Sequence, residues 1–415
     1  MGYTKDAIKG VSWIGSIRVV TRTLTFAKTL VIARILSPAQ FGIFGISTLV
    51  LSFVEILTET GINVFLVQQK DKVDSYISTA WIVSIIRGLV ISLSIVFSAK
   101  YISSFFATPD AYPLLLLIAI VPFVRGFINP SVIKLQKDLL FKKEFLYRSS
   151  LFLIESLVSI ILVILTRNIA SLVIALIISA CCEVFLSFVI VSPKPSLVFV
   201  KEKLWEILRF GKWITTAGIF NYLYQHGDDI VIARILGAPA LGLYDMAYKI
   251  SLSPLSDIGD VVTKVTYPVY VKISEDRERL KSAFIKTVII VIVFTFPIGI
   301  LLFFYPVQII SLLLGEQWQA SAPALQILGI FGVVRALSVF GSTLFLSVEK
   351  QQLFTYTTLI GSLGLGITII PFVMMWGIVG AAFSALFGTI LTIPFIFYHI
   401  FRIFYEKDQL GNSHL

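Results

Sequence analysis

The stretch Val31-Ile32-Ala33-Arg34-Ile35-Leu36 is repeated 200 positions later as Val231-Ile232-Ala233-Arg234-Ile235-Leu236. Further matches keep the same offset on both sides of this stretch: Trp13-Ile14 with Trp213-Ile214, and Gly42 with Gly242. Collinear matches around a six-residue identity indicate an internal duplication. The chain of 415 residues therefore contains two related halves.

The composition is that of a membrane protein. Hydrophobic residues make up 57% of the chain and charged residues only 14%, against roughly 45–50% and about 25% in soluble domains. A soluble enzyme, a nucleic-acid-binding module and a disordered regulator are excluded, because the chain lacks the polar surface to cover its core. Apolar stretches of about 20 residues become membrane-spanning helices, since a helix pairs all its backbone polar groups. We predict twelve spans, at 10–36, 41–66, 77–99, 112–130, 149–166, 169–191, 210–236, 241–263, 283–305, 320–346, 353–374 and 376–401.

The duplication and the spans together predict the architecture. Six spans lie in each half, and an even number gives both halves the same orientation in the membrane. We predict an all-α integral membrane fold, with about twelve transmembrane helices in two parallel-repeat six-helix lobes. Residues 1–191 form the N-terminal lobe, 192–209 a cytoplasmic amphipathic elbow, and 210–415 the C-terminal lobe. Two lobes that rock about a shared cavity provide alternating access, which indicates a transporter.

Lysine and arginine gather on one side of the predicted membrane. The segments on the side of the N-terminus carry 23 of the 34, the opposite segments carry only Lys100 and Arg167, and nine lie within spans. Positively charged loops stay in the cytoplasm, so both termini are predicted to be cytoplasmic, at the plasma membrane. Contact with anionic headgroups accounts for the net charge of +10, and no nucleic-acid partner is needed to explain it.

The first helix of each half carries polar residues that lipid would not tolerate. In the span 10–36, Arg18 and Arg22 share one face with three threonines, and Lys28 lies beside this face. A planar guanidinium donates two parallel hydrogen bonds to a phosphate. We therefore predict that Arg18, Arg22 and Lys28 bind the anionic group of a cargo molecule.

The corresponding span in the second half has a polar face of the opposite charge. Its members are Asn221, Gln225, Asp228 and Asp229. Asn221 and Gln225 are predicted to bind the cargo. Adjacent carboxylates disfavour double ionisation, so Asp228 or Asp229 is predicted to bind a coupling ion, H⁺ or Na⁺. No other cofactor and no metal site is expected, since the chain has three histidines and no nucleotide-binding motif.

Structural roles compete with these assignments. Lys28 aligns with Asp228 at the repeat offset, and an ion pair between them could simply hold the lobes together. Arg18 could extend to the cytoplasmic headgroups, and Arg34 and Arg234 are expected to reach the outer ones. Further charges predicted inside the membrane could each form a structural pair: Glu55, Glu59, Arg87, Arg125, Glu155, Glu183, Lys249 and Arg335.

Motifs in both halves resemble those of a known family. The first half contains Ala33-Arg34-Ile35-Leu36-Ser37-Pro38, Phe41-Gly42, Gly61 and Leu66-Val67-Gln68-Gln69-Lys70. The second half contains Phe210-Gly211, Asp229, Gly237, Leu241-Gly242-Leu243-Tyr244, Ala247, Tyr267-Pro268 and a charged loop at 274–279. Over nearly the whole chain this layout resembles the polysaccharide flippases, the Wzx-type oligosaccharide exporters of the multidrug/oligosaccharidyl-lipid/polysaccharide exporter superfamily.

The resemblance implies two six-helix lobes around a central V-shaped cavity. It implies an antiporter-like flippase rather than an enzyme, which moves polyprenyl-diphosphate-linked oligosaccharide repeat units from the cytoplasmic to the outer leaflet. The product would serve the biosynthesis of cell-surface polysaccharide such as lipopolysaccharide. The implied partners are this lipid-linked oligosaccharide, membrane lipids and other polysaccharide assembly proteins. A cationic cavity matches Arg18, Arg22 and Lys28 by position, whereas the Asp228-Asp229 pair departs from the family pattern.

Two other functions compete with this prediction. A multidrug cation exporter of the same superfamily would need an acidic and aromatic cavity, whereas the first half is cationic. A membrane glycosyltransferase or polymerase would need catalytic carboxylates outside the membrane. The predicted outer loops contain only Asp110 and Glu316, which is a poor catalytic constellation.

Overall fold

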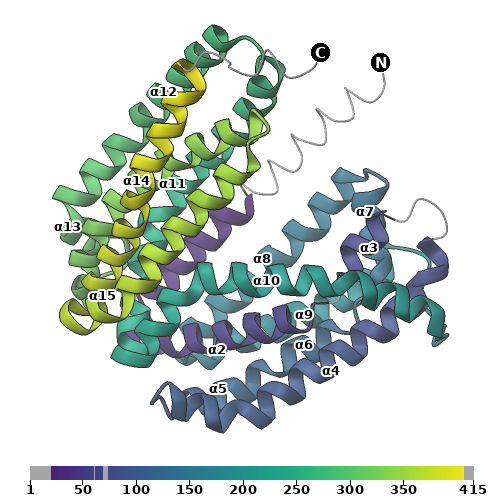
Figure 1. The fold of residues 1–415 in the computed structure, drawn as a ribbon. Helices are drawn as coiled ribbons and strands as arrows, with labels where there is room; N and C mark the ends of the chain where they lie inside the picture. The colour runs from purple at the N-terminus through teal and green to yellow at the C-terminus, as the bar shows by residue number, and fades with distance from the viewer. Residues whose placement is uncertain (1–19, 60, 69–72, 406–415) are drawn as a thin grey trace, which may run out of the picture. The chain divides into compact units, whose positions relative to one another are not determined.

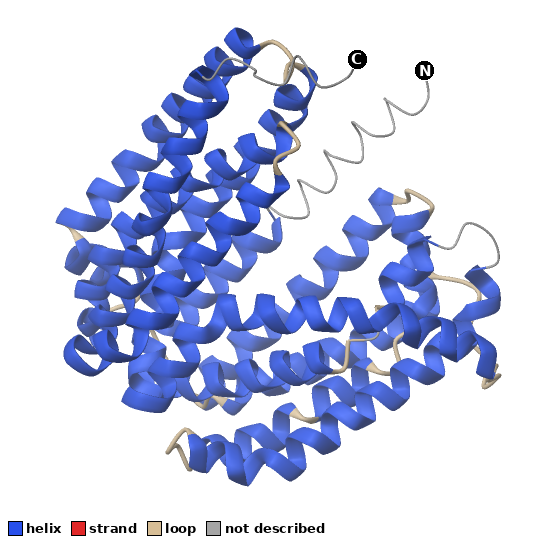
Figure 2. Cartoon of the chain, in the orientation of Figure 1, coloured by secondary structure: helices blue, strands red, loops and turns tan. Residues whose placement is uncertain are grey.

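Helices joined by short loops make up the described part of the chain, in which no residue is in a strand (Figure 2). The computed structural model describes residues 20–59, 61–68 and 73–405, except for the side chains of 207–214, 216–217, 256–257 and 260–261. The predicted all-α fold is therefore confirmed.

The chain divides into two compact units, Met1–Pro239 and Ala240–Leu415. The helices of the first unit (Figure 1) are 20–33, α2 (Pro38–Leu57), α3 (Ile62–Gln68), α4 (Val73–Phe105), α5 (Ala111–Ile118), α6 (Ile120–Arg125), η1 (Pro130–Val132), α7 (Ile133–Lys137), α8 (Phe141–Thr166), α9 (Ala170–Ile190) and α10 (Lys201–Leu236). The helices of the second unit are α11 (Ala238–Lys272), α12 (Arg277–Phe304), α13 (Pro306–Leu313), η2 (Glu316–Ser321), α14 (Ala322–Ser347) and α15 (Gln351–Tyr405). Helix α11 begins two residues before the boundary between the units.

Every predicted span has a helical counterpart. Within the described residues, seven helices are long and apolar enough to cross a membrane, and a pair of shorter helical segments bent by 70° gives an eighth. α10 and α11 have 36 and 35 residues but carry several charges. The structure thus supports a multi-pass membrane protein, while twelve crossings stay a prediction.

The last helix, α15, is a helical hairpin. Its 55 residues would reach about 80 Å as one straight helix, more than twice a bilayer core of roughly 30 Å. Gly377 interrupts the helical backbone, with φ of 60° and ψ of −138°. Glycine tolerates positive φ because it lacks a Cβ. The break falls close to the expected boundary between the spans 353–374 and 376–401.

Glycines let the two halves of α15 approach closely. A Cβ at Gly388 would lie 2.7 Å from the carbonyl oxygen of Gly361, and one at Gly364 would lie 2.9 Å from the Gly388 Cα. Helices in membranes often pack through such small residues, because van der Waals contact replaces the hydrophobic driving force.

We expect Gly388→Ala to destabilise the protein by about 1–3 kcal/mol, because the new methyl group meets backbone atoms that cannot move aside. Gly366→Ala is the matched control, since a Cβ there has no neighbour within 4 Å. Thermal unfolding of the detergent-solubilised protein measures both effects. Equal unfolding temperatures for the two variants would contradict this packing.

The two copies of the repeat end their first helix in different ways. In the first copy, Ser37 begins α2 with a capping box: its backbone N–H donates to Gln40 Oε1 over 2.9 Å, and its hydroxyl accepts from the Gln40 N–H. In the second copy, α10 ends at Leu236 and Gly237 takes φ of 82°. In both copies, the helix ends within or directly after the shared sequence.

Helix α10 packs with the first unit, although the repeat places residues 210–236 in the second lobe. The Tyr222 hydroxyl donates to the Leu49 carbonyl oxygen over 2.7 Å, and the Thr215 hydroxyl donates to the Glu59 carbonyl oxygen over 2.5 Å. The first contact attaches α10 to α2, and the second attaches it to the loop that follows α2. The repeat shows that residues 210–236 correspond in sequence to residues 10–36. The hydrogen bonds show which helices are in contact.

The predicted elbow, 192–209, is attached to the start of α4. The Val200 N–H donates to Thr79 Oγ1 over 3.3 Å, and the Tyr76 hydroxyl donates to Glu206 over 2.7 Å. Helix α10 begins at Lys201 and continues without a break to Leu236. Trp205 remains 63% exposed, as an interfacial anchor requires.

Candidate functional site

The predicted cargo-binding helix of the first half is described from residue 20 onward. Arg18 lies outside the described residues. Arg22 and Thr25 are exposed on the helix at 20–33, whereas Ile32 and Ala33 at its end are buried. The Arg22 guanidinium is therefore accessible, as ligand binding requires.

Lys28 forms an ion pair with Glu155, which lies on α8. Its Nζ is 2.6 Å from the Glu155 Oε1, and the two side chains are only 18% and 17% exposed. Sequence comparison pointed to Asp228 as a partner, because the two residues align in the repeat. The structure instead provides a carboxylate from within the first half. An anionic ligand would have to share the ammonium group with Glu155 or displace it.

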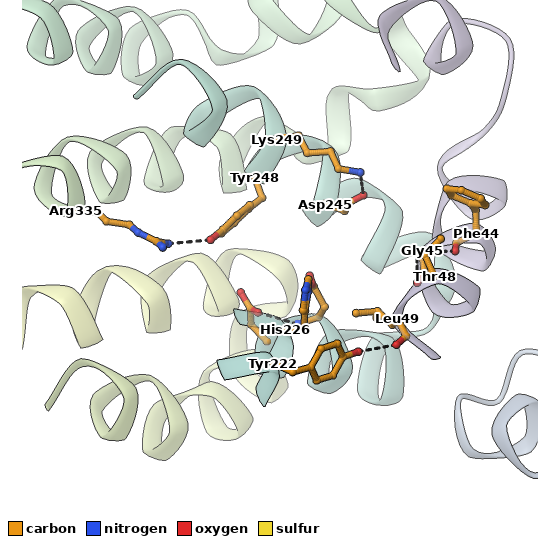
Figure 3. Close-up of polar contacts among 12 residues, drawn as sticks. Phe44, Gly45, Thr48, Leu49, Tyr222, His226, Asp245, Tyr248, Lys249 and Arg335 are labelled. Carbon is orange, nitrogen blue, oxygen red and sulfur yellow. Dashed lines mark hydrogen bonds and ion pairs between the residues drawn. The ribbon is translucent and has the colours of Figure 1, made fainter. Parts of the chain in front are cut away.

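The polar face of α10 combines exposed amides with buried acidic groups. Asn221 and Gln225 are exposed, and the Gln225 Nε2 donates to the Asn221 Oδ1 over 3.1 Å. The neighbouring Tyr222 is buried, and Figure 3 shows its hydroxyl directed at the Leu49 carbonyl oxygen. The two amides are therefore available to hydrogen-bond a polar ligand, while Tyr222 holds the helix in place.

The two predicted ion-binding aspartates have different surroundings. Asp228 is only 7% exposed and accepts a hydrogen bond from the Asp229 N–H over 3.0 Å. Asp229 Oδ2 lies 3.2 Å from His226 Nδ1. The imidazole lies 4.9 Å, centroid to centroid, from the Tyr222 ring. His226 was not predicted as a site residue, although its spacing of three residues from Asp229 places both on one helical face.

Charge pairs within the membrane helices acquire definite partners. In the first unit, Arg87 binds Glu59 over 2.9 Å, and Arg125 lies 3.7 Å from Glu183. In the second unit, Lys249 binds Asp245 over 2.6 Å, and Arg335 donates to the Tyr248 hydroxyl over 3.0 Å (Figure 3). Only the Lys249–Asp245 pair, at a spacing of four residues, carried a local signal in the sequence.

Comparisons with known proteins agree with the sequence-based resemblance. The family described as polysaccharide biosynthesis protein matches residues 31–323. Lipopolysaccharide biosynthesis protein WzxC of Escherichia coli (strain K12) is 25% identical over 339 residues, which cover 81% of this chain and 69% of the relative.

Two solved structures have similar folds. Lipid II flippase MurJ, in an inward closed conformation, aligns with a TM-score of 0.75 and 17% identity, over 93% of this chain and 87% of that one. An inward-facing multidrug resistance MATE family transporter of the MOP superfamily aligns with a TM-score of 0.66 and 16% identity, over 92% and 94%. These alignments confirm the two-lobe transporter fold.

The matched proteins are named as biosynthesis proteins, flippases and transporters rather than as catalysts, in agreement with the prediction that the chain is not an enzyme. The motifs that suggested this family lie at residues 33–70 and 210–279, and the family match includes both stretches. With that match extending over more than half of its length, this chain belongs to the polysaccharide biosynthesis protein family.

Proposed function

We propose that this protein is a flippase that moves polyprenyl-diphosphate-linked oligosaccharide repeat units from the cytoplasmic to the outer leaflet by alternating access. The cargo would be used to build a cell-surface polysaccharide. The family match, the relative named for lipopolysaccharide biosynthesis and the fold shared with a lipid II flippase all support this proposal.

The exposed Arg22 on a predicted membrane helix carries the proposal. A charged side chain inside a membrane is expensive, so its retention points to a functional role. In our proposal, Arg22 binds the diphosphate of the cargo together with Arg18, four positions earlier in the sequence, and Lys28. The exposed amides of Asn221 and Gln225 hydrogen-bond the cargo's polar groups.

The coupling ion, H⁺ or Na⁺, is proposed to bind at Asp228 or Asp229. The burial of Asp228 makes a full charge costly there, and binding a cation or a proton removes that cost. His226 supports Asp229, since its Nδ1 lies within hydrogen-bonding distance of that carboxylate.

We further propose that the protein resides in the plasma membrane with both termini in the cytoplasm. The asymmetry of lysine and arginine between the two sets of loops supports this orientation. Membrane lipids surround it there, and other polysaccharide assembly proteins would supply its cargo and receive it.

Deletion of the gene is expected to leave lipid-linked oligosaccharide on the inner leaflet, because the cargo can no longer cross. Labelling of the sugar in sealed inverted and right-side-out vesicles measures its leaflet. Restoring the intact gene, but not an Arg22→Ala gene, should return the cargo to the outer leaflet.

Multidrug export is the second candidate function, favoured by the fold shared with a MATE family transporter and by the buried Asp228. Drug sensitivity of the deletion strain without accumulation of lipid-linked sugar would favour that function and contradict the flippase.

A further inference from the structure

A cluster of five charged residues lies among the helices of the first unit. It consists of Glu55 on α2, Glu59 two residues after the end of α2, Arg87 on α4, Arg125 on α6 and Glu183 on α9. All five side chains are half-buried, and four of them lie in helices that the hydropathy assigns to the membrane. We call this set the α2–α9 charge cluster.

Two of the three carboxylates in the α2–α9 charge cluster have a partner. Glu59 accepts from Arg87 over 2.9 Å and from the Gly61 N–H over 2.9 Å. Glu183 lies 3.7 Å from Arg125. These two contacts engage both arginines with carboxylates other than that of Glu55.

Glu55 is the third carboxylate, and it has no ion pair or hydrogen bond through its side chain within the described residues. Arg87 does reach this residue, but its guanidinium donates to the Glu55 carbonyl oxygen over 2.8 Å. Arg87 and Arg125 act on the Glu55 carboxylate only at longer range. Glu55 is thus a half-buried acid in a membrane helix without a counter-ion at contact distance.

The arginines of the cluster retain unused donors. The Nε atoms of Arg87 and Arg125 are both buried and make no hydrogen bond, and that of Arg125 lies 3.7 Å from the Glu183 carboxylate. With every group ionised, the five side chains carry a net charge of −1, since three acids oppose two arginines. One added proton makes the cluster neutral, and both arginines act electrostatically on the Glu55 carboxylate.

We propose that Glu55 is a proton-binding residue of this protein. A proton from water binds the Glu55 carboxylate to give a neutral carboxylic acid, and it returns to water when a guanidinium pairs with the anion. A carboxylate that lacks a counter-ion is costly within a membrane, and protonation removes this cost. The use of this proton to drive cargo movement rests on the proposed flippase function.

The groups that face Glu55 are consistent with this exchange. They are Glu59 from the loop after α2, Arg87 from α4 and Arg125 from α6. Among the described side chains of α10, the nearby Thr215 is uncharged and donates to the Glu59 carbonyl oxygen. The neighbouring α5 contains no acidic or basic residue.

This site is separate from the aspartates of α10. Helices α2 and α10 run antiparallel, since Leu49 contacts Tyr222 and Glu59 contacts Thr215. Continuing this register places Asp228 near residues 43–46 of α2, which is about 15 Å along the helix from Glu55. The two groups can therefore be tested independently.

Infrared difference spectroscopy of the purified protein in nanodiscs, between alkaline and acidic pH, tests the proposal. The intact protein should gain a carboxylic-acid C=O band that is absent from Glu55→Gln and shifted in Glu55→Asp. Glu59→Gln, four residues further along the chain, should keep the band. Persistence of the band in Glu55→Gln, or its loss in Glu59→Gln alone, would overturn the assignment.

Transport in proteoliposomes tests the use of the proton. A pH gradient should accelerate cargo movement by the intact protein, whereas Glu55→Gln should move cargo at the same rate with and without the gradient. A gradient response that survives in Glu55→Gln would contradict a coupling role. If the intact protein moved no lipid-linked oligosaccharide, the flippase function would fail, while the infrared result would still decide whether Glu55 binds a proton.

Discussion

Alanine at Arg22 is expected to reduce movement of a fluorescently tagged polyprenyl-diphosphate oligosaccharide by about 10- to 100-fold. Charge-assisted hydrogen bonds contribute about 1.5–3 kcal/mol, which corresponds to this change in affinity. Lysine at the same position should retain part of the activity, because it keeps the charge but loses the planar fork that binds two phosphate oxygens. Proteoliposomes that report the leaflet of the tag provide the measurement.

Arg34 provides a matched control for Arg22. It is also exposed, it lies on the same segment, and it follows the end of the helix at 20–33. Arg34→Ala should leave transport within about twofold of the intact protein, since a surface arginine contributes little. Equal losses at Arg22 and Arg34 would show that arginine supports this segment generally and does not bind cargo.

Removing Lys28 alone is expected to abolish transport and to destabilise the protein by about 3–5 kcal/mol, because Glu155 would be left as a largely buried charge without its partner. The double variant Lys28→Glu, Glu155→Lys restores an ion pair of reversed polarity. We expect this exchange to recover most of the thermal stability in detergent. It should not recover transport, because the cargo diphosphate would meet a carboxylate in place of the ammonium group.

This comparison separates the two roles considered for Lys28. If the ion pair only joins the helix at 20–33 to α8, either residue can carry the positive charge. Transport would then return together with stability in the Lys28→Glu, Glu155→Lys protein. A residue that also binds an anion works only as a cation. Glu155→Gln, which leaves Lys28 in place, should retain more transport than Lys28→Gln at similar thermal stability.

The helices themselves follow directly from the sequence. Long apolar runs predict membrane-spanning helices because an unpaired backbone group cannot remain in hydrocarbon. The hexapeptide at 31–36 and its copy at 231–236 predicted two related halves. In both copies a helix ends within or directly after the hexapeptide. Helical spacing alone also placed Asn221 and Gln225 on one face, where their side chains are hydrogen-bonded to each other.

The partners of the charged residues depend on tertiary structure. Lys28 and Glu155 are 127 positions apart, and no spacing rule joins residues on different helices. The same holds for Arg87 and Glu59, whose pairing leaves the Glu55 carboxylate without an ion pair among the described residues. The packing of α10 against α2 likewise depends on where the Tyr222 hydroxyl meets a backbone carbonyl.

The periodicity of polar and apolar residues therefore predicts which residues share a helical face, because this pattern depends only on one helix and its surroundings. Which faces meet is a property of the whole chain, since it depends on the close fit of many side chains at once. For this protein, the sequence alone was sufficient to predict a duplicated membrane transporter with a cationic first helix. Only the packed helices show that Lys28 pairs with Glu155 and that, in the part of the chain that the structure describes, Glu55 has no ion pair.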